Sequence, residues 1–259
     1  MRHAGRAAIT LPLIAAPVAH AGPALQLQID GASLAVPPGD LDGASDVART
    51  RPVTVRSASG SQRQTAGGTS ARRLVELVGI APAAVTSLTV QAGGTENGGV
   101  SISGAELRGG FAGDPLCPAC DATFDAAYGE GTVAFFRPLR DAADLNAADH
   151  VQPALGQSLI VRVDSVASRI PVSVSVSDSS PDPGEAVQLR AVVPDGERPE
   201  LTWYFGDGTS GSGAAATHRY EAGHWTAGVM AHDAAGYGAA TAVLSVGDAA
   251  PASLAPAPS

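Results

Sequence analysis

Apolar and polar residues alternate along this chain in short runs, and glycine, proline or aspartate ends each run. The clearest run is 171–178, where three valines alternate with serines and fall on one face of an extended strand. Similar runs follow at 187–193, 201–205, 225–229 and 239–246. Short strands at regular spacing, separated by turn residues, are typical of an all-β sandwich, which we predict for residues 167–247.

The pattern before residue 167 is less regular. It predicts strands at 25–29, 33–36, 52–56, 85–90, 100–103, 129–136 and 157–163. It predicts a loop at 40–49, a short helical turn at 105–107, and a helical turn or loop at 141–150, and it assigns no helix or strand to the polar Ser/Gly/Gln stretch at 57–68. A helix is predicted at 71–78, with Thr69 or Ser70 as N-cap and Gly79 as left-handed C-cap. We therefore predict a strand-rich α+β domain at 22–166.

The two ends of the chain read as processing and tail segments. A basic start with Arg2 and Arg6, an apolar run at 7–18 and the sequence Ala19-His20-Ala21 predict a secretory signal cleaved after Ala21. The run is shorter than the roughly 20 apolar residues of a membrane-spanning helix, so we expect a secreted or extracytoplasmic protein with no membrane span in the mature chain. The Ala/Pro/Ser-rich segment 248–259 predicts a disordered tail.

Charge excludes one class of partner. The net charge is −9, and all 16 basic residues are arginines without a clustered patch. Binding to phosphate backbones needs clustered cations, so we expect no nucleic-acid partner.

Three elements of the sandwich carry a recognisable motif. Residues 203–209 read Trp-Tyr-Phe-Gly-Asp-Gly-Thr, residues 217–220 read Thr-His-Arg-Tyr, and residues 221–225 read Glu-Ala-Gly-His-Trp. Together they resemble the PKD (polycystic kidney disease) domain, with its W-D-F-G-D-G-T strand, in an immunoglobulin-like β-sandwich. The signature residues are Trp203, Phe205, Gly206, Asp207, Gly208, His218, Tyr220 and Gly223.

We interpret these signature residues as structural. Trp203 and Phe205 share one face of a strand and are expected to anchor the core. The chain departs from the family at Tyr204, where an aspartate is usual, and at a light strand with Ala227, Gly228 and Ala231. From these departures we expect a less tightly packed sandwich.

The two cysteines, Cys117 and Cys120, form a Cys-x-x-Cys pair. In an exported protein this pair predicts a loop-stapling disulfide; a thioredoxin-like redox pair and half of a metal site are alternatives. The redox alternative requires the first cysteine at a helix N-terminus after a strand, whereas the preceding residues read as a loop.

Other candidate ligands are dispersed in the sequence. A metal site built from His218, His224 and His232 is conceivable, but their spacing does not make them converge. The aspartates of the sandwich lack the twelve-residue spacing of a calcium loop. We assign no metal, no cofactor and no catalytic residue.

The first domain carries a fainter likeness. The order of a strand near Thr54, a capped helix at 71–78, a strand at 85–90 and the segment 99–107 resembles part of the sulfite-oxidase-type molybdopterin-binding fold. That family holds its cofactor with one cysteine and basic residues, and no residue here matches those roles. The resemblance implies a cofactor-free remnant.

Two functions follow. The first is an exported, non-catalytic binding or spacer protein whose PKD-like module contacts a protein or a carbohydrate at or outside the cell surface. The alternative is an extracytoplasmic thiol-redox protein that uses Cys117 and Cys120.

Overall fold

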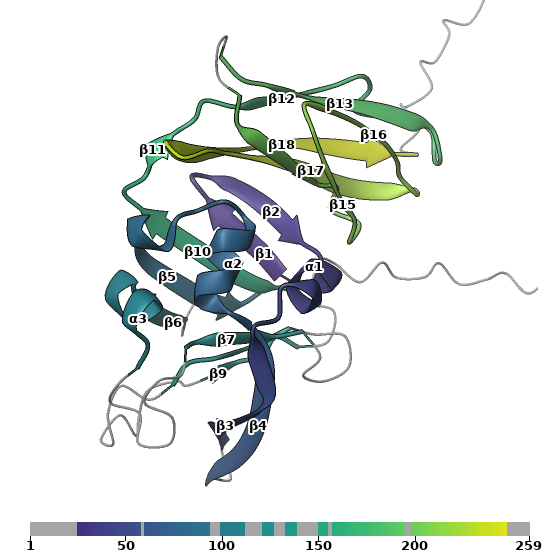
Figure 1. Cartoon of the computed structure of the whole chain (residues 1–259). Coiled ribbons are helices and arrows are strands. Elements are labelled where there is room, and N and C mark those ends of the chain that lie inside the picture. The colour runs from purple at the N-terminus through teal and green to yellow at the C-terminus, as the bar shows by residue number, and fades with distance from the viewer. Residues whose placement is uncertain are drawn as a thin grey trace, which may run out of the picture.

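The computed structural model has an N-terminal unit and a C-terminal sandwich (Figure 1). It describes residues 25–57, 60–93, 99–111, 121–126, 133–138, 150–154, 157–194 and 198–247. No helix among these residues is long and apolar enough to cross a membrane. The predicted signal segment, both cysteines and the predicted tail lie outside the described residues.

The N-terminal unit contains a five-stranded sheet, which we call the N-terminal sheet, in the order β2-β1-β10-β5-β6. Its strands are β1 (Leu25–Ile29), β2 (Ala32–Val36), β5 (Val85–Ala92), β6 (Val100–Ser103) and β10 (Leu159–Ser165). Asp30 and Gly31 connect β1 to β2 with φ values of 51° and 86°, as a tight two-residue hairpin requires. The parallel pairing of β1 with β10 brings the two ends of this unit together at its centre.

A second sheet, the hairpin sheet, has the order β3-β4-β7-β8-β9. Its strands are β3 (Val47–Ser57), β4 (Gly60–Ser70), β7 (Thr123–Asp125), β8 (Ala134–Phe136) and β9 (His150–Val151). The polar stretch at 57–68, to which the sequence assigned no element, pairs with β3 along most of its length. Backbone hydrogen bonds supply this pairing, and they leave no trace in the pattern of apolar residues.

Short helices connect the strands of the N-terminal unit. They are α1 (Pro38–Gly43), α2 (Ala71–Leu77), the 3₁₀ turn η1 (Pro82–Ala84) and α3 (Gly104–Gly109). The predicted loop at 40–49 is wrong, since α1 begins with Pro38 in its first turn and buries Leu41. The predicted caps of α2 are confirmed: the Ser70 side chain accepts a hydrogen bond from Arg73 N, and Gly79 has φ of +76°.

The C-terminal sandwich has two sheets that pack face to face. The inner sheet, on the side of the N-terminal unit, has the order β11-β18-β17-β14-β15, and the outer sheet has the order β12-β13-β16 (Figure 1). The inner strands are β11 (Ser168–Arg169), β14 (Glu200–Tyr204), β15 (Ser210–Ser212), β17 (Gly223–His232) and β18 (Gly236–Val246). The outer strands are β12 (Ser173–Val176), β13 (Ala186–Val192) and β16 (Ala215–Arg219).

The predicted fold class is confirmed: an α+β N-terminal unit precedes an all-β sandwich. A core between the sandwich sheets contains Val187, Leu189, Trp203, Val229 and Leu244, all fully buried. A second core fills the N-terminal unit and extends to Tyr204, Met230 and Tyr237 of the inner sheet. The two parts of the chain therefore share a hydrophobic core.

Candidate functional site

The signature strand β14 places alternate side chains on opposite faces of the inner sheet. Trp203 is fully buried between the two sheets, and its indole Nε1 donates a hydrogen bond of 2.9 Å to Gly213 O. Phe205 is buried in the same core. After it the chain turns at Gly206, with φ of +91°, where a Cβ atom would lie 2.6 Å from Thr226 O. Gly208 and Gly223 also have positive φ values, of 89° and 146°.

Asp207 and His218 form the polar corner of the signature. Asp207 Oδ2 lies 2.6 Å from His218 Nε2, and Asp207 Oδ1 accepts hydrogen bonds from Thr209 N and Thr209 Oγ1. The His218 ring stacks on Phe205, with centroids 4.1 Å apart, and meets the edge of Tyr220 at 4.7 Å. The buried Tyr220 hydroxyl has no hydrogen-bond partner among the described residues, and burial raises its pKa. This corner holds a turn against the sandwich core.

The corner makes stability depend on pH. Burial would raise the pKa of the Asp207 carboxyl, but hydrogen bonds from Thr209 and His218 and the charge of His218 hold that pKa below its ordinary value. The folded state therefore favours the carboxylate, and this stabilisation is present above the unfolded-state pKa of about 3.9 and lost as pH falls through the folded-state pKa. We expect Asp207→Asn to lower the free energy of unfolding by about 1 kcal/mol near neutral pH.

The Asp207→Asn prediction is checked by urea unfolding at several pH values. The difference between wild type and variant should start to shrink near pH 4 and vanish once the pH falls through the lowered folded-state pKa of Asp207, since both proteins then carry a neutral side chain at this position. Asp178→Asn, at a turn aspartate of the same sandwich, serves as control. A difference for Asp207→Asn that stays constant from neutral pH to pH 3 would contradict the prediction.

The three sandwich histidines make separate contacts. His218 binds Asp207, His224 Nδ1 lies 3.1 Å from Ser245 Oγ, and His232 Nε2 lies 3.7 Å from Glu200 Oε2. Among the described residues, no three histidine, cysteine or acidic side chains are grouped so that they could hold a metal ion. Cys117 and Cys120 lie outside the described residues, so the disulfide and its redox and metal alternatives stay predictions.

The face of the inner sheet that points away from the sandwich core packs on the N-terminal unit. Strands β17 and β18 lie over β2 (Figure 1), and β14 contacts β2 as well. Tyr204 lies between Trp203 and Phe205 in sequence, so it points to this opposite face, where it is 1% exposed. Burial raises the pKa of the Tyr204 phenol, and the nearby negative charge of Asp40 raises it further. The residue that departs from the family motif is thus an interface residue.

Glycines of the interface allow a close approach. A Cβ atom at Gly228 would lie 2.5 Å from Leu34 Cδ2, and one at Gly79 would lie 2.0 Å from His232 Cγ. The expectation of loose packing is wrong at Gly228, because Leu34 of β2 fills the space that a side chain would occupy. The sequence departures at Tyr204 and Gly228 were the available signal for this interface.

The segment that joins the two parts is also fixed. Arg169 binds Asp30 of the β1–β2 turn through two contacts, Nε to Oδ2 at 2.5 Å and Nη2 to Oδ1 at 2.8 Å. The same guanidinium lies 4.4 Å from the ring centroid of Tyr237, whose hydroxyl is 2.8 Å from Ser165 Oγ. The sandwich is therefore attached to the N-terminal unit by polar contacts as well as by the apolar face of its inner sheet.

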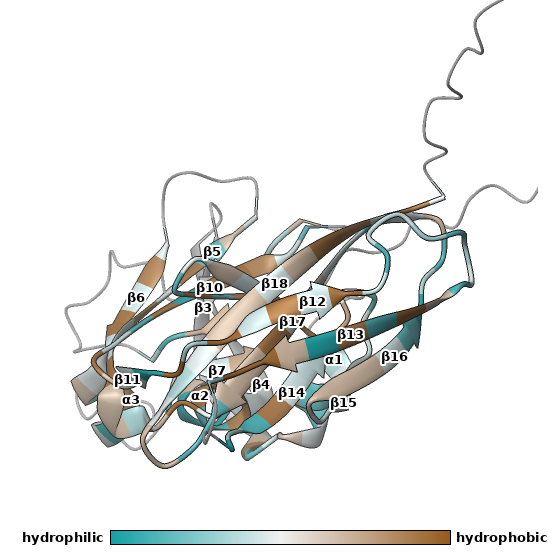
Figure 2. Ribbon diagram, turned by 90° about the horizontal axis from the view of Figure 1, so that it is seen from above, coloured by the Kyte–Doolittle hydropathy of each residue, from teal (hydrophilic) through white to brown (hydrophobic). Residues whose placement is uncertain are grey.

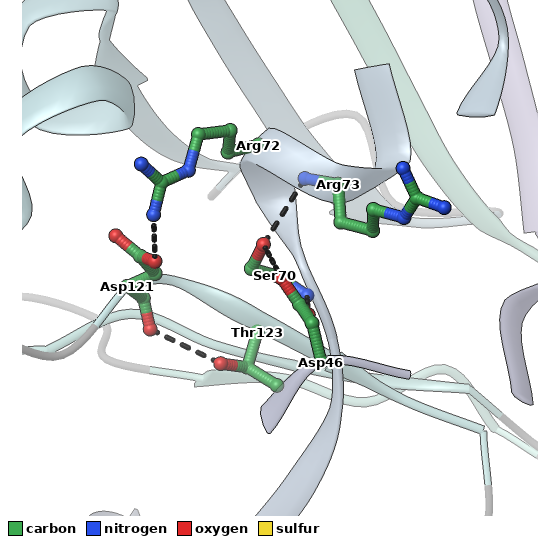
Figure 3. Close-up of polar contacts among 6 residues, drawn as sticks. All are labelled: Asp46, Ser70, Arg72, Arg73, Asp121 and Thr123. Carbon is green, nitrogen blue, oxygen red and sulfur yellow. Dashed lines mark hydrogen bonds and ion pairs between the residues drawn. The ribbon is translucent and has the colours of Figure 1, made fainter. Parts of the chain in front are cut away.

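A polar cluster holds helix α2 in the N-terminal unit (Figure 3). Asp46 accepts hydrogen bonds of 2.7 Å from both Ser70 N and Ser70 Oγ, and the Ser70 hydroxyl oxygen accepts one from Arg73 N. Arg72 Nη2 lies 2.7 Å from Asp121 Oδ2. These contacts join the start of α2 to Asp46, just before β3, and to Asp121, just before β7. We interpret the cluster as structural.

Comparison with known proteins identifies the sandwich. Residues 171–246 match the PKD domain family model. The PKD domain covers under a third of the chain and includes every signature residue named above. A search of curated proteins found no match to the chain.

Solved structures with immunoglobulin-like modules overlay on parts of the chain. The PKD domain of human VPS10 domain-containing receptor SorCS2 is 23% identical over 33% of this chain and 77% of its own length, with a TM-score of 0.27. Fibronectin(III)-like modules of Clostridium thermocellum CbhA are 10% identical over 65% of this chain and 83% of theirs, with a TM-score of 0.23. Murine CEACAM1b is 8% identical over 63% of this chain and 86% of its own, with a TM-score of 0.26.

Proposed function

We propose that this chain is an exported, non-catalytic binding protein whose PKD domain contacts a protein or a carbohydrate through its outer sheet. The observation that carries the proposal is the unequal use of the two sandwich sheets. The inner sheet packs on β2, whereas alternate residues of β13 and β16 in the outer sheet are exposed. Figure 2 shows hydrophilic and hydrophobic residues alternating along β13.

The exposed side of the outer sheet has the chemistry of a polar contact surface. A hollow of about 280 Å³ is lined by Gln188, Arg190 and Thr217, among others. Register places Ser175 beside Arg190, and Gln188 beside Thr217, across neighbouring strands. The Arg190 side chain has no ion-pair or hydrogen-bond partner among the described residues. On a protein with net charge −9, this guanidinium is available for an acidic group of a partner.

The surface is tested by retention on immobilised probes. Acidic and neutral polysaccharides and extracellular-matrix proteins would be coated separately, and retention of wild type and Arg190→Glu compared. We expect at least one probe to retain the wild type, and Arg190→Glu to weaken that retention about tenfold or more, since it replaces a charged hydrogen-bond donor by a repelling charge. Arg73→Glu is the matched control, because the Arg73 side chain on α2 is 47% exposed and lies outside the PKD domain. Equal weakening by both variants would reject the outer sheet as the contact surface.

The proposed export rests on the sequence of the first residues. Expressed in a bacterial host, the full chain should appear outside the cytoplasm with Gly22 as its first residue, because signal peptidase cleaves after the small-x-small pattern. Intact-mass measurement of the exported fraction decides the point. A full-length chain that stays in the cytoplasm would contradict export without affecting the binding test.

A further inference from the structure

A polar groove lies where the N-terminal sheet meets the segment that leads into the PKD domain. Its volume is about 530 Å³, within the range of small-molecule sites, and the junction of two structural units is a common place for such sites. The β1–β2 turn, strand β10 and Arg169 border it. Gln28, Ser33, Thr86, Arg162, Asp164 and Ser165 contribute most of its polar lining.

The groove has two pairs of charged side chains. One pair is joined by contacts between its members, and the other, which we call the open pair, is not. Asp30 and Arg169 neutralise each other through their two contacts. Arg162 and Asp164 remain, two residues apart on β10, so both point to the same exposed face of the sheet. They form no ion pair with each other in the described part of the chain.

Neither member of the open pair is saturated. Arg162 makes one long hydrogen bond, from Nη2 to Gln28 Oε1 at 3.3 Å, so further guanidinium N–H groups are free to donate. Asp164 accepts a hydrogen bond of 2.6 Å from Ser87 Oγ, and a carboxylate can accept several more. The groove thus offers one anion-binding group and one cation-binding group, carried by residues that lie ~6.6 Å apart along the strand.

We propose that this groove binds a small zwitterion, whose carboxylate pairs with Arg162 and whose ammonium pairs with Asp164. Hydroxyl and amide groups line the rest of the groove, and no aromatic side chain does, so a polar ligand fits better than an apolar one. A ligand with one sign of charge meets one attractive and one repelling group. The proposal is independent of the outer-sheet contact, because the groove and the outer sheet share no residue.

The test is calorimetric titration of the full chain with glycine, 4-aminobutyrate and 6-aminohexanoate. Both side chains are solvent-exposed, so we expect a dissociation constant on the order of 1 mM for the zwitterion whose charges match the spacing. Butyrate and butylamine carry one charge each, and we expect each to bind at least about tenfold more weakly than the best zwitterion. No saturable binding of any of the three zwitterions at millimolar concentrations would overturn the proposal.

Variants locate the site. Arg162→Gln and Asp164→Asn should each weaken binding of the best zwitterion about tenfold, and the exchange Arg162→Asp with Asp164→Arg should restore part of it with the ligand reversed. Arg73→Gln, on α2 and outside the groove, should leave binding unchanged. Butyrate binding as tightly as the best zwitterion, or equal weakening by Arg73→Gln, would also overturn the proposal. Thermal melts of each variant verify that it is folded.

Discussion

Tyr204→Asp is expected to separate the PKD domain from the N-terminal unit, although aspartate is the usual residue of the PKD motif at this position. The Tyr204 ring is fully enclosed in the shared core, so the change removes a large apolar contact and places a carboxylate in its stead. Burying an unpaired carboxylate beside Asp40 is unfavourable, and we expect the free energy of unfolding to fall by at least about 3 kcal/mol. Calorimetry should show one transition for wild type and two for the variant.

The matched control for Tyr204→Asp is Tyr204→Phe. Phenylalanine keeps the ring and its packing, so the cost should stay below about 1.5 kcal/mol, and the single transition should persist. If Tyr204→Asp melts as the wild type does, the interface does not couple the two parts in solution.

Trp203→Ala should have the second large effect, in the core between the two sandwich sheets. The Trp203 side chain is fully buried, and its removal leaves a cavity and an unpaired Gly213 carbonyl. We expect a loss of about 3–5 kcal/mol in the free energy of unfolding, measured by urea titration. Trp203→Phe should cost less, because a ring remains in the core. A midpoint unchanged by Trp203→Ala would show that this residue is not a core anchor.

The sandwich could be predicted because its pattern and its motif agree. Along β13 buried and exposed residues alternate, and along β12 partly buried and exposed ones do, so alternation along 171–178 and 187–193 identified both strands directly. The signature turn could be predicted as well. Its glycines with positive φ and the aspartate that binds its own turn are residue types that indicate such a turn in the sequence.

The hairpin sheet and α1 were missed for a common reason. Strand β4 consists largely of serine, glutamine, glycine and threonine, residues that ordinarily indicate a loop, and only its pairing with β3 makes it a strand. Helix α1 has six residues, follows Pro37 and starts with Pro38, so it presents a single buried leucine instead of a helical repeat. In both cases tertiary contacts, and not local preference, decide the structure.

The interface and the groove depend on residues far apart in sequence. Leu34 and Gly228 are neighbours only because β2 lies under the inner sheet, and no periodicity connects them. Arg162 and Asp164 alternate with buried valines along β10, but only the binding of Asp30 by Arg169 leaves them as the pair open to a ligand. Sequence reasoning identified the modules and could not show how they meet.

The way β11 joins the inner sheet has a mechanical consequence. β11 pairs in parallel with the first residues of β18, and Gly236 and Gly238 let it lie so close that Cβ atoms there would be 2.1 Å from Ser168 O and 1.9 Å from Ile170 O. A force that pulls the end of β18 away from the N-terminal unit would slide these parallel strands along each other. Their hydrogen bonds, with the one from Ile170 N to Tyr237 O, would be loaded together in shear instead of being peeled apart one at a time. The junction is thus built to resist tension along the chain.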